Sequence, residues 1–373
     1  MQEMSIFDLL SADESAKYKP KKSNDWKWTF ADYPKEKNGL KVFSCFACGG
    51  GSTMGYKLAG CEVLGCCEID PKMNAIYIKN HHPKYNFLMD IREFNALPNE
   101  QIPGELFDVD ILDGSPPCTT FSMAGVREKS WGKKKVFREG QKEQTLDDLS
   151  FVFIDTVRKL RPKVVIMENV EGLLLGEAYS YVKKIYKEFR DAGYALHHWL
   201  LKGENMGVPQ ARHRVFFVGI RTDLWIDPMD IDMSFDYEPV LFGDVKTGDG
   251  DPVNEGTEVK KWLDLSLPQD KNLSQVVVRH GLPEKLFSEI ILQDHNVANT
   301  LRSSGGFYRG TEKTKISVGD CVSIQTFPQD YDFVTRSLTF VQYVCGMSVP
   351  PIMIKRVVQR LIDHGVFEYK GEL

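Results

Sequence analysis

Apolar residues along the middle of the chain fall in short runs, which longer amphipathic stretches separate. Five runs have the length of a buried strand: residues 41–46, 62–69, 109–114, 163–168 and 214–220. Residues 149–160 and 179–192 repeat apolar positions at helical spacing. Buried strands that alternate with helices are typical of βαβ units, so the pattern predicts an α/β fold with a mainly parallel sheet.

This alternation does not extend over the whole chain. Residues 1–38 are polar and predict an N-terminal extension, in which Trp26, Trp28 and Phe30 pack on the body. After residue 221 the sequence becomes rich in Asp, Pro and Gly, which indicates an inserted second domain. We predict four parts: the extension 1–38, a main α/β domain 39–222, a second domain with its hinge 223–336, and a C-terminal helical segment 337–373 that returns to the main domain.

The composition is that of a soluble protein. The chain has 373 residues, of which 42% are hydrophobic and 27% charged. No run approaches the ~20 apolar residues of a membrane span, and the first residues lack the basic start and apolar core of a secretion signal. We therefore expect a cytoplasmic protein with eight reduced cysteines and no membrane partner.

The formal net charge of −5 is an average over regions of opposite character. Residues 223–270 hold 13 acidic and three basic residues, a net of −10, so the remainder carries +5. Residues 127–142 hold seven basic and two acidic residues. A basic run is most often a solvated loop, but this one follows a Pro-Pro-Cys sequence closely. The average alone argues against a nucleic-acid partner, whereas the distribution permits one.

A glycine-rich turn, Cys48-Gly49-Gly50-Gly51, joins the first predicted strand to a helix. Such a turn either lets a ligand approach the backbone or is a plain tight turn. Glu68 ends the next strand 19 residues beyond Gly49, where nucleotide-binding folds place an acid on the ribose hydroxyls. Asp90, after a third strand, either accepts from an adenine amino group or caps the following helix.

Cys118 is the candidate nucleophile. It follows an apolar run that ends in Gly-Ser-Pro-Pro, and the two prolines stiffen the chain at the same sheet edge as the glycine turn. The positive charge of residues 127–142 is a source of thiolate stabilisation. Cys45 and Cys48 form a lone C-x-x-C without a second pair, and no histidine pair has metal-binding spacing, so we expect no metal.

Two further groups of polar residues follow at strand ends. Glu168 and Asn169 end the fourth strand, where Glu168 either donates a hydrogen bond from a partly dry pocket or acts as a helix N-terminal carboxylate. Arg212 and Arg214 are two residues apart, so strand geometry points both to one side, to grip a phosphate or a base carbonyl, and His213 to the other.

Together these motifs resemble the C5-cytosine-specific DNA methyltransferase family of bacteria and phages. The resemblance covers most of residues 40–221 and the C-terminal tail, and it rests on motifs in the family order: FACGGGSTMGYKLAG, CCEID, GSPPCTTFS, RPKVVIMENV, GVPQARHRVFFVGIR, QTFPQDYDF and YVCGMSVPP. It implies a Rossmann-like domain that binds S-adenosylmethionine and a smaller target-recognition domain at 223–336. Each motif alone is weak evidence, and the combination is specific.

The resemblance also implies a reaction. Cys118 would add to C6 of a cytosine flipped out of duplex DNA, and C5 would then accept the methyl group. Glu168 would bind N3 and the amino group, Arg212 the base carbonyl, with Arg214 and Asn169 in support. The products are 5-methylcytosine and S-adenosylhomocysteine. We expect a monomer that acts on double-stranded DNA, with a cognate restriction endonuclease as an optional partner.

The cofactor contacts implied by the resemblance come from the strand ends and the tail. They are Phe46, Ala47, Gly50, Gly51, Glu68, Ile69, Asp90, Ile91, Pro117, Leu149, Ser348 and Val349. Three positions depart from the family pattern: Cys48 replaces a turn glycine, Thr119 a glutamine and Met347 an asparagine. Lys315 and Asp320 match only loosely the Arg and Glu that brace the target-recognition domain in the family. None of these departures removes a catalytic group.

Two other functions are compatible with the sequence. A tRNA cytosine-5 methyltransferase uses the same scaffold, although the Cys-Phe-Thr tripeptide that we associate with it is absent. A catalytically silent DNA-binding homologue would not need Cys118, Glu168 and Arg212. For the acidic residues of the second domain, we predict a position on the face turned away from DNA.

Overall fold

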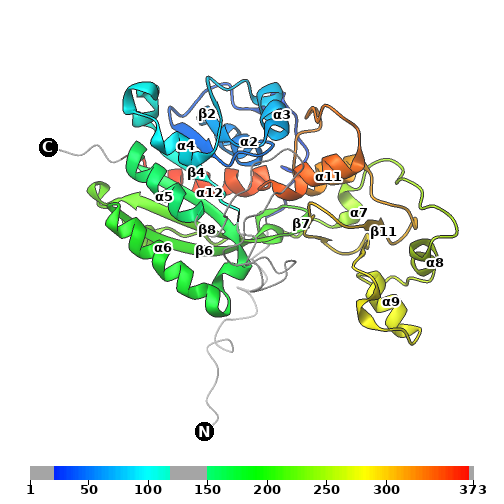
Figure 1. Cartoon of the computed structure of the whole chain (residues 1–373). Coiled ribbons are helices and arrows are strands. Elements are labelled where there is room, and N and C mark those ends of the chain that lie inside the picture. Colours follow the sequence, from blue (N-terminus) through cyan, green and yellow to red (C-terminus); the bar gives the residue numbers. More distant parts are fainter. Residues whose placement is uncertain (1–20, 118–148, 369–373) are drawn as a thin grey trace, which may run out of the picture.

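The main body of the computed structural model, which describes residues 21–117 and 149–368, is a seven-stranded sheet between layers of helices (Figure 1). The strand order is β3-β2-β1-β4-β5-β8-β6. Five neighbouring strands are parallel: β3 (Tyr85–Leu88), β2 (Glu62–Glu68), β1 (Lys41–Cys45), β4 (Ile111–Gly114) and β5 (Val164–Val170). β8 (His213–Arg221) runs antiparallel to both β5 and β6 (Tyr194–Lys202).

In β1, β4, β5 and β8, alternate residues enter two different hydrophobic clusters, one on each face of the sheet. In β5, Ile166 belongs to the first cluster, and Val165 and Met167 belong to the second. Helices α2 (Gly51–Leu58), α3 (Pro71–His81) and α12 (Pro351–Asp363) contribute to the first cluster. Helices α4 (Ile91–Ala96), α5 (Leu149–Leu160) and α6 (Tyr179–Asp191) contribute to the second. This arrangement confirms the α/β, Rossmann-like class.

The C-terminal helical segment consists of two helices. Three residues separate the end of α11 (Leu338–Met347) from Pro351, the first residue of α12. Pro350 and Pro351 explain the break, because the residue before a proline is disfavoured in helical conformation whereas proline is suited to the first helical turn. α12 packs against α2, so the tail returns to the glycine-rich turn (Figure 1).

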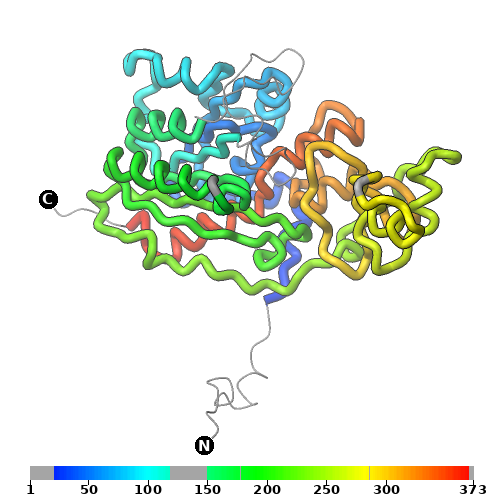
Figure 2. The backbone as a smooth tube through the Cα atoms, turned by 60° about the horizontal axis from the view of Figure 1, so that its bottom comes forward, coloured from blue at the N-terminus to red at the C-terminus, as the bar shows by residue number. Residues whose placement is uncertain are grey.

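After β8 the chain first runs along the main body and then, before α11, forms a second, smaller body at one side of the sheet (Figures 1 and 2). It has its own cluster of buried residues around Trp262, Leu263 and Ile291. Its elements are α7 (Phe242–Val245), α8 (Glu258–Asp264), α9 (Leu273–Arg279), β9 (Ile290–Leu292), β10 (Ala298–Asn299), β11 (Phe307–Arg309) and α10 (Val318–Ile324). β9 pairs with β11, and β10 pairs with β7 (Gln210–Ala211) of the main body. The domain limits given above stay a proposal.

Residues 21–38 lie against the main body. Trp28 is buried, Trp26 and Phe30 are partly buried against the same cluster, and Trp28 Nε1–H donates to the Thr326 carbonyl at 2.8 Å. Lys21 forms an isolated bridge with Tyr237. Within the described ranges, no helix is long and apolar enough to cross a membrane.

The order of the strands fixes where a ligand site is expected. From β1 the chain continues to β2 on one side, whereas β4 pairs with β1 on the other side. Ligands of open α/β sheets bind outside the carboxyl ends of the strands at such a reversal of order. Phe46 directly follows β1, and Ser115 directly follows β4.

Candidate active site

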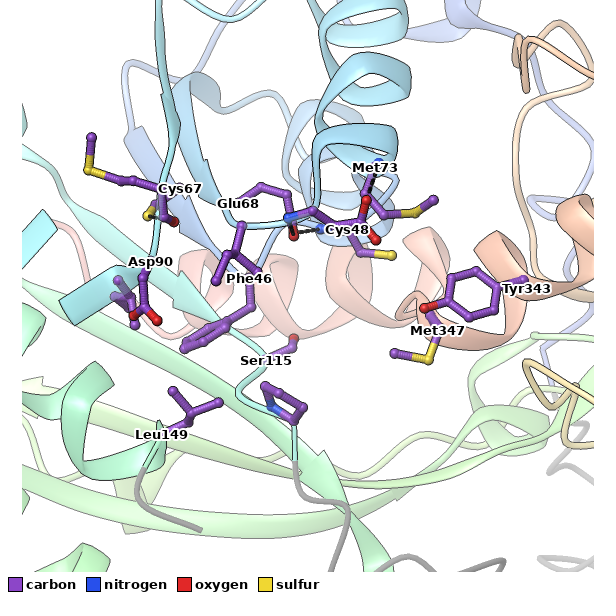
Figure 3. A pocket seen from close by; sticks show the side chains of 15 residues that line it. Phe46, Cys48, Cys67, Glu68, Met73, Asp90, Ser115, Leu149, Tyr343 and Met347 are labelled. Carbon is purple, nitrogen blue, oxygen red and sulfur yellow. Dashed lines mark hydrogen bonds between the residues drawn. The ribbon is translucent and has the colours of Figure 1, made fainter. Parts of the chain in front are cut away.

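A pocket lies at this reversal and opens beside the glycine-rich turn (Figure 3). It encloses about 830 Å³ of space, part of which is open solvent. Its lining residues are Phe46, Cys48, Cys67, Glu68, Ile69, Asp70, Met73, Met89, Asp90, Ile91, Ser115, Pro117, Leu149, Tyr343 and Met347. Seven of the twelve positions implied by the family resemblance are among them.

The five other implied positions, Ala47, Gly50, Gly51, Ser348 and Val349, are absent from the lining. Ser348 and Val349 pack behind the turn: a Cβ added to Gly51 would lie 2.3 Å from the Val349 carbonyl oxygen. The structure therefore gives these two residues a supporting place. Tyr343 and Met347, one helical turn apart on α11, line the pocket instead (Figure 3).

The turn itself has an unusual backbone. Cys48 has a φ of 47° and Gly50 a φ of 83°, both in the left-handed region that favours glycine. Cys48 thus keeps the conformation expected of the glycine it replaces, at a cost in strain. Burial raises the pKa of its thiol to about 12, so the side chain is a neutral part of the pocket wall.

Glu68 is held in place by the backbone. Its Oε2 accepts from the Cys48 N–H at 2.7 Å, and its Oε1 accepts from the Asp70 N–H at 2.8 Å (Figure 3). Burial raises the pKa of this carboxyl group, and the two N–H donors oppose that shift. Each oxygen keeps a second lone pair, so Glu68 can still accept from ligand hydroxyl groups.

Asp90 lines the pocket and also caps a helix. Its Oδ1 accepts from the Arg92 N–H at 2.8 Å at the start of α4, and Arg92 Nη1 lies 3.4 Å from its Oδ2. The helix-capping contact, one of the two roles that the sequence suggested for Asp90, is therefore present. Asp90 also forms part of the pocket wall, so Oδ2 can accept a hydrogen bond from a ligand in addition to its contact with Arg92.

Glu168 and Arg214 form an ion pair at the end of β5. Arg214 Nε lies 2.9 Å from Glu168 Oε1, and both side chains are largely buried. Asn169 Nδ2–H donates to the Pro116 carbonyl at 3.3 Å, which ties β5 to the segment just before Cys118. Cys118, Thr119 and the basic stretch 127–142 lie outside the described residues, so their roles stay predictions.

Arg212 is buried, and its guanidinium group hydrogen-bonds backbone carbonyls instead of pointing into a ligand pocket. Nη1 donates to the Leu301 carbonyl at 3.3 Å, and Nη2 donates to the Gly346 carbonyl at 3.2 Å. Gln210 Oε1 accepts from the Leu301 N–H at 2.8 Å. Arg212 and Gln210 thus hold residue 301 from both sides, a connecting role that the sequence did not suggest. Arg212 Nε has no partner among the described residues.

His213 lies between two glutamate side chains, and its orientation away from Arg212 and Arg214 stays a prediction. Its Nε2 lies 2.8 Å from Glu204 Oε1, and its Nδ1 lies 3.4 Å from Glu171 Oε2. Within the described residues, no three His, Cys, Asp or Glu side chains are grouped so that they could hold a metal ion.

Asp113, at the end of β4, is a buried acid that sequence reasoning missed. Its Oδ2 accepts from Ser44 Oγ–H at 2.6 Å, and its Oδ1 accepts from the Tyr56 hydroxyl at 3.0 Å. Burial raises the pKa of Asp113 to about 7, the hydroxyl donors oppose the shift, and the charge of Glu168 adds to it. An aspartate within an apolar strand end was the available signal.

We expect the free energy of unfolding of Asp113→Asn, measured relative to that of wild type, to increase as the pH rises. The raised pKa means that folded Asp113 keeps its proton between about pH 4 and pH 7, whereas the unfolded chain loses it. Its stabilising contribution therefore falls through that window, by on the order of 1 kcal/mol per pH unit. Denaturant titrations of both proteins at pH 5 and pH 8 measure the difference. An equal difference at the two pH values would contradict the shift.

The fold and this pocket define an α/β protein with a pocket at the carboxyl edge of its sheet, where open α/β sheets bind ligands. The particular family follows from comparison: the chain belongs to the C-5 cytosine-specific DNA methylase family, which matches residues 40–363. The membership confirms the resemblance inferred from the motifs, and it makes the chain a member of a methyltransferase family.

Individual relatives agree with the family. The chain is 29% identical over 370 residues to the Type II methyltransferase M.FnuDI of Fusobacterium nucleatum, covering 87% of this chain and 96% of the relative. It is 25% identical to the Type II methyltransferase M.NgoPII of Neisseria gonorrhoeae, covering 85% and 94%. These relatives support DNA methylation and restriction-modification as the biological setting.

Solved structures support the fold. A prophage-encoded E. coli protein described as a DNA modification methyltransferase matches 87% of this chain and 99% of its own, with a TM-score of 0.62 and 19% identity. A DNMT2 variant of Spodoptera frugiperda matches 87% and 100%, with a TM-score of 0.58 and 18% identity. At these identities the likeness extends to the fold alone.

Proposed function

We propose that the protein transfers a methyl group from S-adenosylmethionine to C5 of a cytosine in a specific sequence of double-stranded DNA. The observation that carries the proposal is the convergence of two features on one sheet edge. The pocket of β1, β2 and β4 reaches Pro117, the residue before Cys118. Asn169 ties the same segment to β5, which carries Glu168 two residues before its end.

The pocket has the chemistry that S-adenosylmethionine requires. Phe46, Ile69 and Leu149 offer apolar surface to an adenine ring, Glu68 can accept from ribose hydroxyls, and Asp90 can accept from the adenine amino group. The other wall, with Cys48, Met73, Tyr343 and Met347, is left for the methionine end. When bound, the cofactor supplies an electrophilic methyl group.

Cytosine C5 is a weak nucleophile, so the protein has to activate it. The Cys118 thiolate forms a bond to C6, which moves electron density to C5 and charge to N3. Glu168 donates its proton to N3 and accepts from the exocyclic amino group, and the donated proton stabilises that charge. After methylation, loss of the C5 proton to a base and departure of Cys118 restore the aromatic ring.

The observed contacts refine the roles of the two arginines. Arg214 pairs with Glu168 and is thus positioned beside any base that Glu168 binds. Arg212 holds the backbone at Leu301 and Gly346, so we assign it the connection between the main and smaller bodies. The sequence analysis gave Arg212 the contact with the base and Arg214 the supporting role, and this assignment exchanges the two.

A stacked cytosine cannot reach these groups, so the base has to flip out of the duplex, at a cost of a few kcal/mol. The basic stretch 127–142 and the smaller body are the proposed DNA contacts. In the smaller body, acids pair internally: Asp270 with Arg279 at 2.6 Å, and Asp264 with Lys260 at 2.6 Å. The proposal further includes that the protein acts as a monomer and that a cognate restriction endonuclease recognises the same DNA site.

Methyl incorporation from labelled S-adenosylmethionine tests the function. The substrates are long unmethylated DNA amplified in vitro, which presents many sequences, and unmodified tRNA. Label in DNA at C5 of cytosine supports the proposal. Label in tRNA alone would establish the tRNA enzyme, and label in neither, from protein that binds the cofactor, would establish the silent homologue.

We expect Glu168→Gln to lower kcat about 100-fold and to leave the Kd for S-adenosylmethionine within about twofold. Glutamine can still hydrogen-bond the base but has no acidic proton to give to N3, so the negative charge of the activated base is less well stabilised. Glu168 itself is not part of the pocket lining. Single-turnover methylation and calorimetric cofactor binding measure the two quantities. Glu171→Gln, three residues along the chain, is the matched control and keeps wild-type kcat. Equal kcat in both variants would remove Glu168 from the reaction.

A further inference from the structure

The glycine-rich turn is held from behind by two side chains from distant segments. The Gly49 carbonyl accepts from the Tyr331 hydroxyl at 2.6 Å and lies 3.2 Å from His81 Nε2. His81 ends α3, and Tyr331 follows α10. The family assignment explains neither contact, because both side chains lie outside the pocket lining.

The His81 ring packs closely against the glycine-rich turn. It is buried, and a Cβ added to Gly50 would lie only 2.0 Å from its Nε2, so ring and turn are packed closely. Burial, with help from Lys57, lowers the pKa of His81 to about 3, which keeps the ring neutral. A neutral ring that donates to Gly49 carries its proton on Nε2, and Nδ1 has no partner in the described part of the chain.

The N-terminal segment completes this support. The Phe30 ring lies 6.3 Å from the rings of both His81 and Tyr331, perpendicular to the first. The Phe30 N–H donates to Asp330 Oδ1 at 3.0 Å, next to Tyr331 in the chain. Phe30 is thus fixed against both side chains that meet the Gly49 carbonyl.

We propose that Tyr331 and His81 are positioning residues for the cofactor turn and that the segment around Phe30 stabilises both. The inference rests on the proposed function, since it assigns these residues to the affinity for S-adenosylmethionine. It also gives a role to residues that precede the matched family region, which begins at residue 40.

The physical link is the peptide plane. The Gly49 carbonyl and the Gly50 N–H belong to one rigid unit, and that N–H donates to the Ala47 carbonyl at 2.8 Å. Fixing the carbonyl therefore fixes the turn directly after Cys48, whose left-handed backbone persists only if its surroundings hold it. Cys48 lines the pocket, and its N–H orients Glu68. A looser turn consequently weakens cofactor binding.

Tyr331→Phe is the direct test, because it removes only the hydroxyl group. Calorimetry with S-adenosylmethionine should show a Kd raised about three- to tenfold, with KM for DNA within about twofold of wild type. His81→Leu should act in the same direction, and His81→Gln, which keeps a neutral N–H donor, should recover part of the affinity. Phe30→Leu should give a smaller rise.

Tyr194→Phe is the matched control. Tyr194 is also buried, and its hydroxyl donates to the Pro162 carbonyl at 2.6 Å, away from the turn. It should lower the denaturant midpoint much as Tyr331→Phe does and leave the Kd unchanged. Equal Kd values for Tyr331→Phe, Tyr194→Phe and wild type would overturn the positioning role. A wild-type protein that binds no S-adenosylmethionine would instead overturn the proposed function.

Discussion

Replacing Cys118 by Ser is expected to lower methyl transfer to cytosine at least about a thousandfold. A hydroxyl is far less acidic than a thiol, so serine provides almost no nucleophilic anion at neutral pH. Pro117 belongs to the pocket wall, and the replacement is nearly isosteric, so cofactor affinity should stay at its wild-type value. Initial rates on long unmethylated DNA and calorimetry with S-adenosylmethionine measure the two effects.

Covalent trapping separates this loss from misfolding. DNA that contains 5-fluorocytosine has no C5 proton to lose, so wild-type enzyme should remain bonded to it after methylation, visible by denaturing electrophoresis. Cys118→Ser should form no such species. Cys61→Ala is the control, because this buried cysteine precedes β2 at the opposite edge of the sheet. Trapping by Cys118→Ser would exclude Cys118 as the nucleophile.

Replacing Asp320 by Leu is expected to destabilise the protein by about 3–5 kcal/mol. Asp320 and Arg309 are both almost fully buried, and their side chains meet at 2.8 Å. Arg309 also donates to the Thr247 and Gly248 carbonyls at 2.8 Å each, so the pair joins β11, α10 and the segment after α7. Loss of the carboxylate leaves an uncompensated buried cation, which is much costlier than loss of an exposed pair.

Denaturant titration of wild type and Asp320→Leu measures this loss. The double variant Arg309→Met/Asp320→Leu should recover much of it, because the buried charge is then removed together with its partner. Asp191→Asn, which breaks the exposed i,i+4 pair with Lys187, should leave the midpoint unchanged. A midpoint for Asp320→Leu equal to that of Asp191→Asn would contradict a structural role for the buried pair.

Elements that are continuous in sequence could be predicted closely. The run at 41–46 and the helix at 149–160 became β1 and α5 within one residue, since apolar periodicity and flanking glycines specify them locally. β6 was missed, because its centre, Leu196-His197-His198-Trp199, is only partly buried and shows no apolar run. Its antiparallel pairing with β8 depends on distant residues.

The site could be predicted where a motif lies on a strand end, and not where a distant segment completes it. Phe46, Glu68 and Asp90 line the pocket because parallel strands deliver their carboxyl ends to one edge. Tyr343 and Met347 complete it from α11, almost 200 residues beyond Leu149, the nearest lining residue in the chain. No local pattern gives that contact.

Two side-chain assignments illustrate the same limit. Lys315 and Asp320 were matched loosely to the bracing Arg and Glu of the family, and the structure pairs Asp320 with Arg309. Arg212 was expected at a substrate, but its guanidinium meets the carbonyls of Leu301 and Gly346. In both cases the partner is set by tertiary packing, which residue type and spacing do not give.

Bisulfite sequencing of genomic DNA tests the central claim most directly. The DNA comes from a host without cytosine methylation that expresses either the wild-type protein or Cys118→Ser. The account predicts that cytosines within one short sequence resist conversion throughout the genome with wild type, and that none resist with Cys118→Ser. Complete conversion in both, from wild-type protein that is folded and binds S-adenosylmethionine, would contradict it.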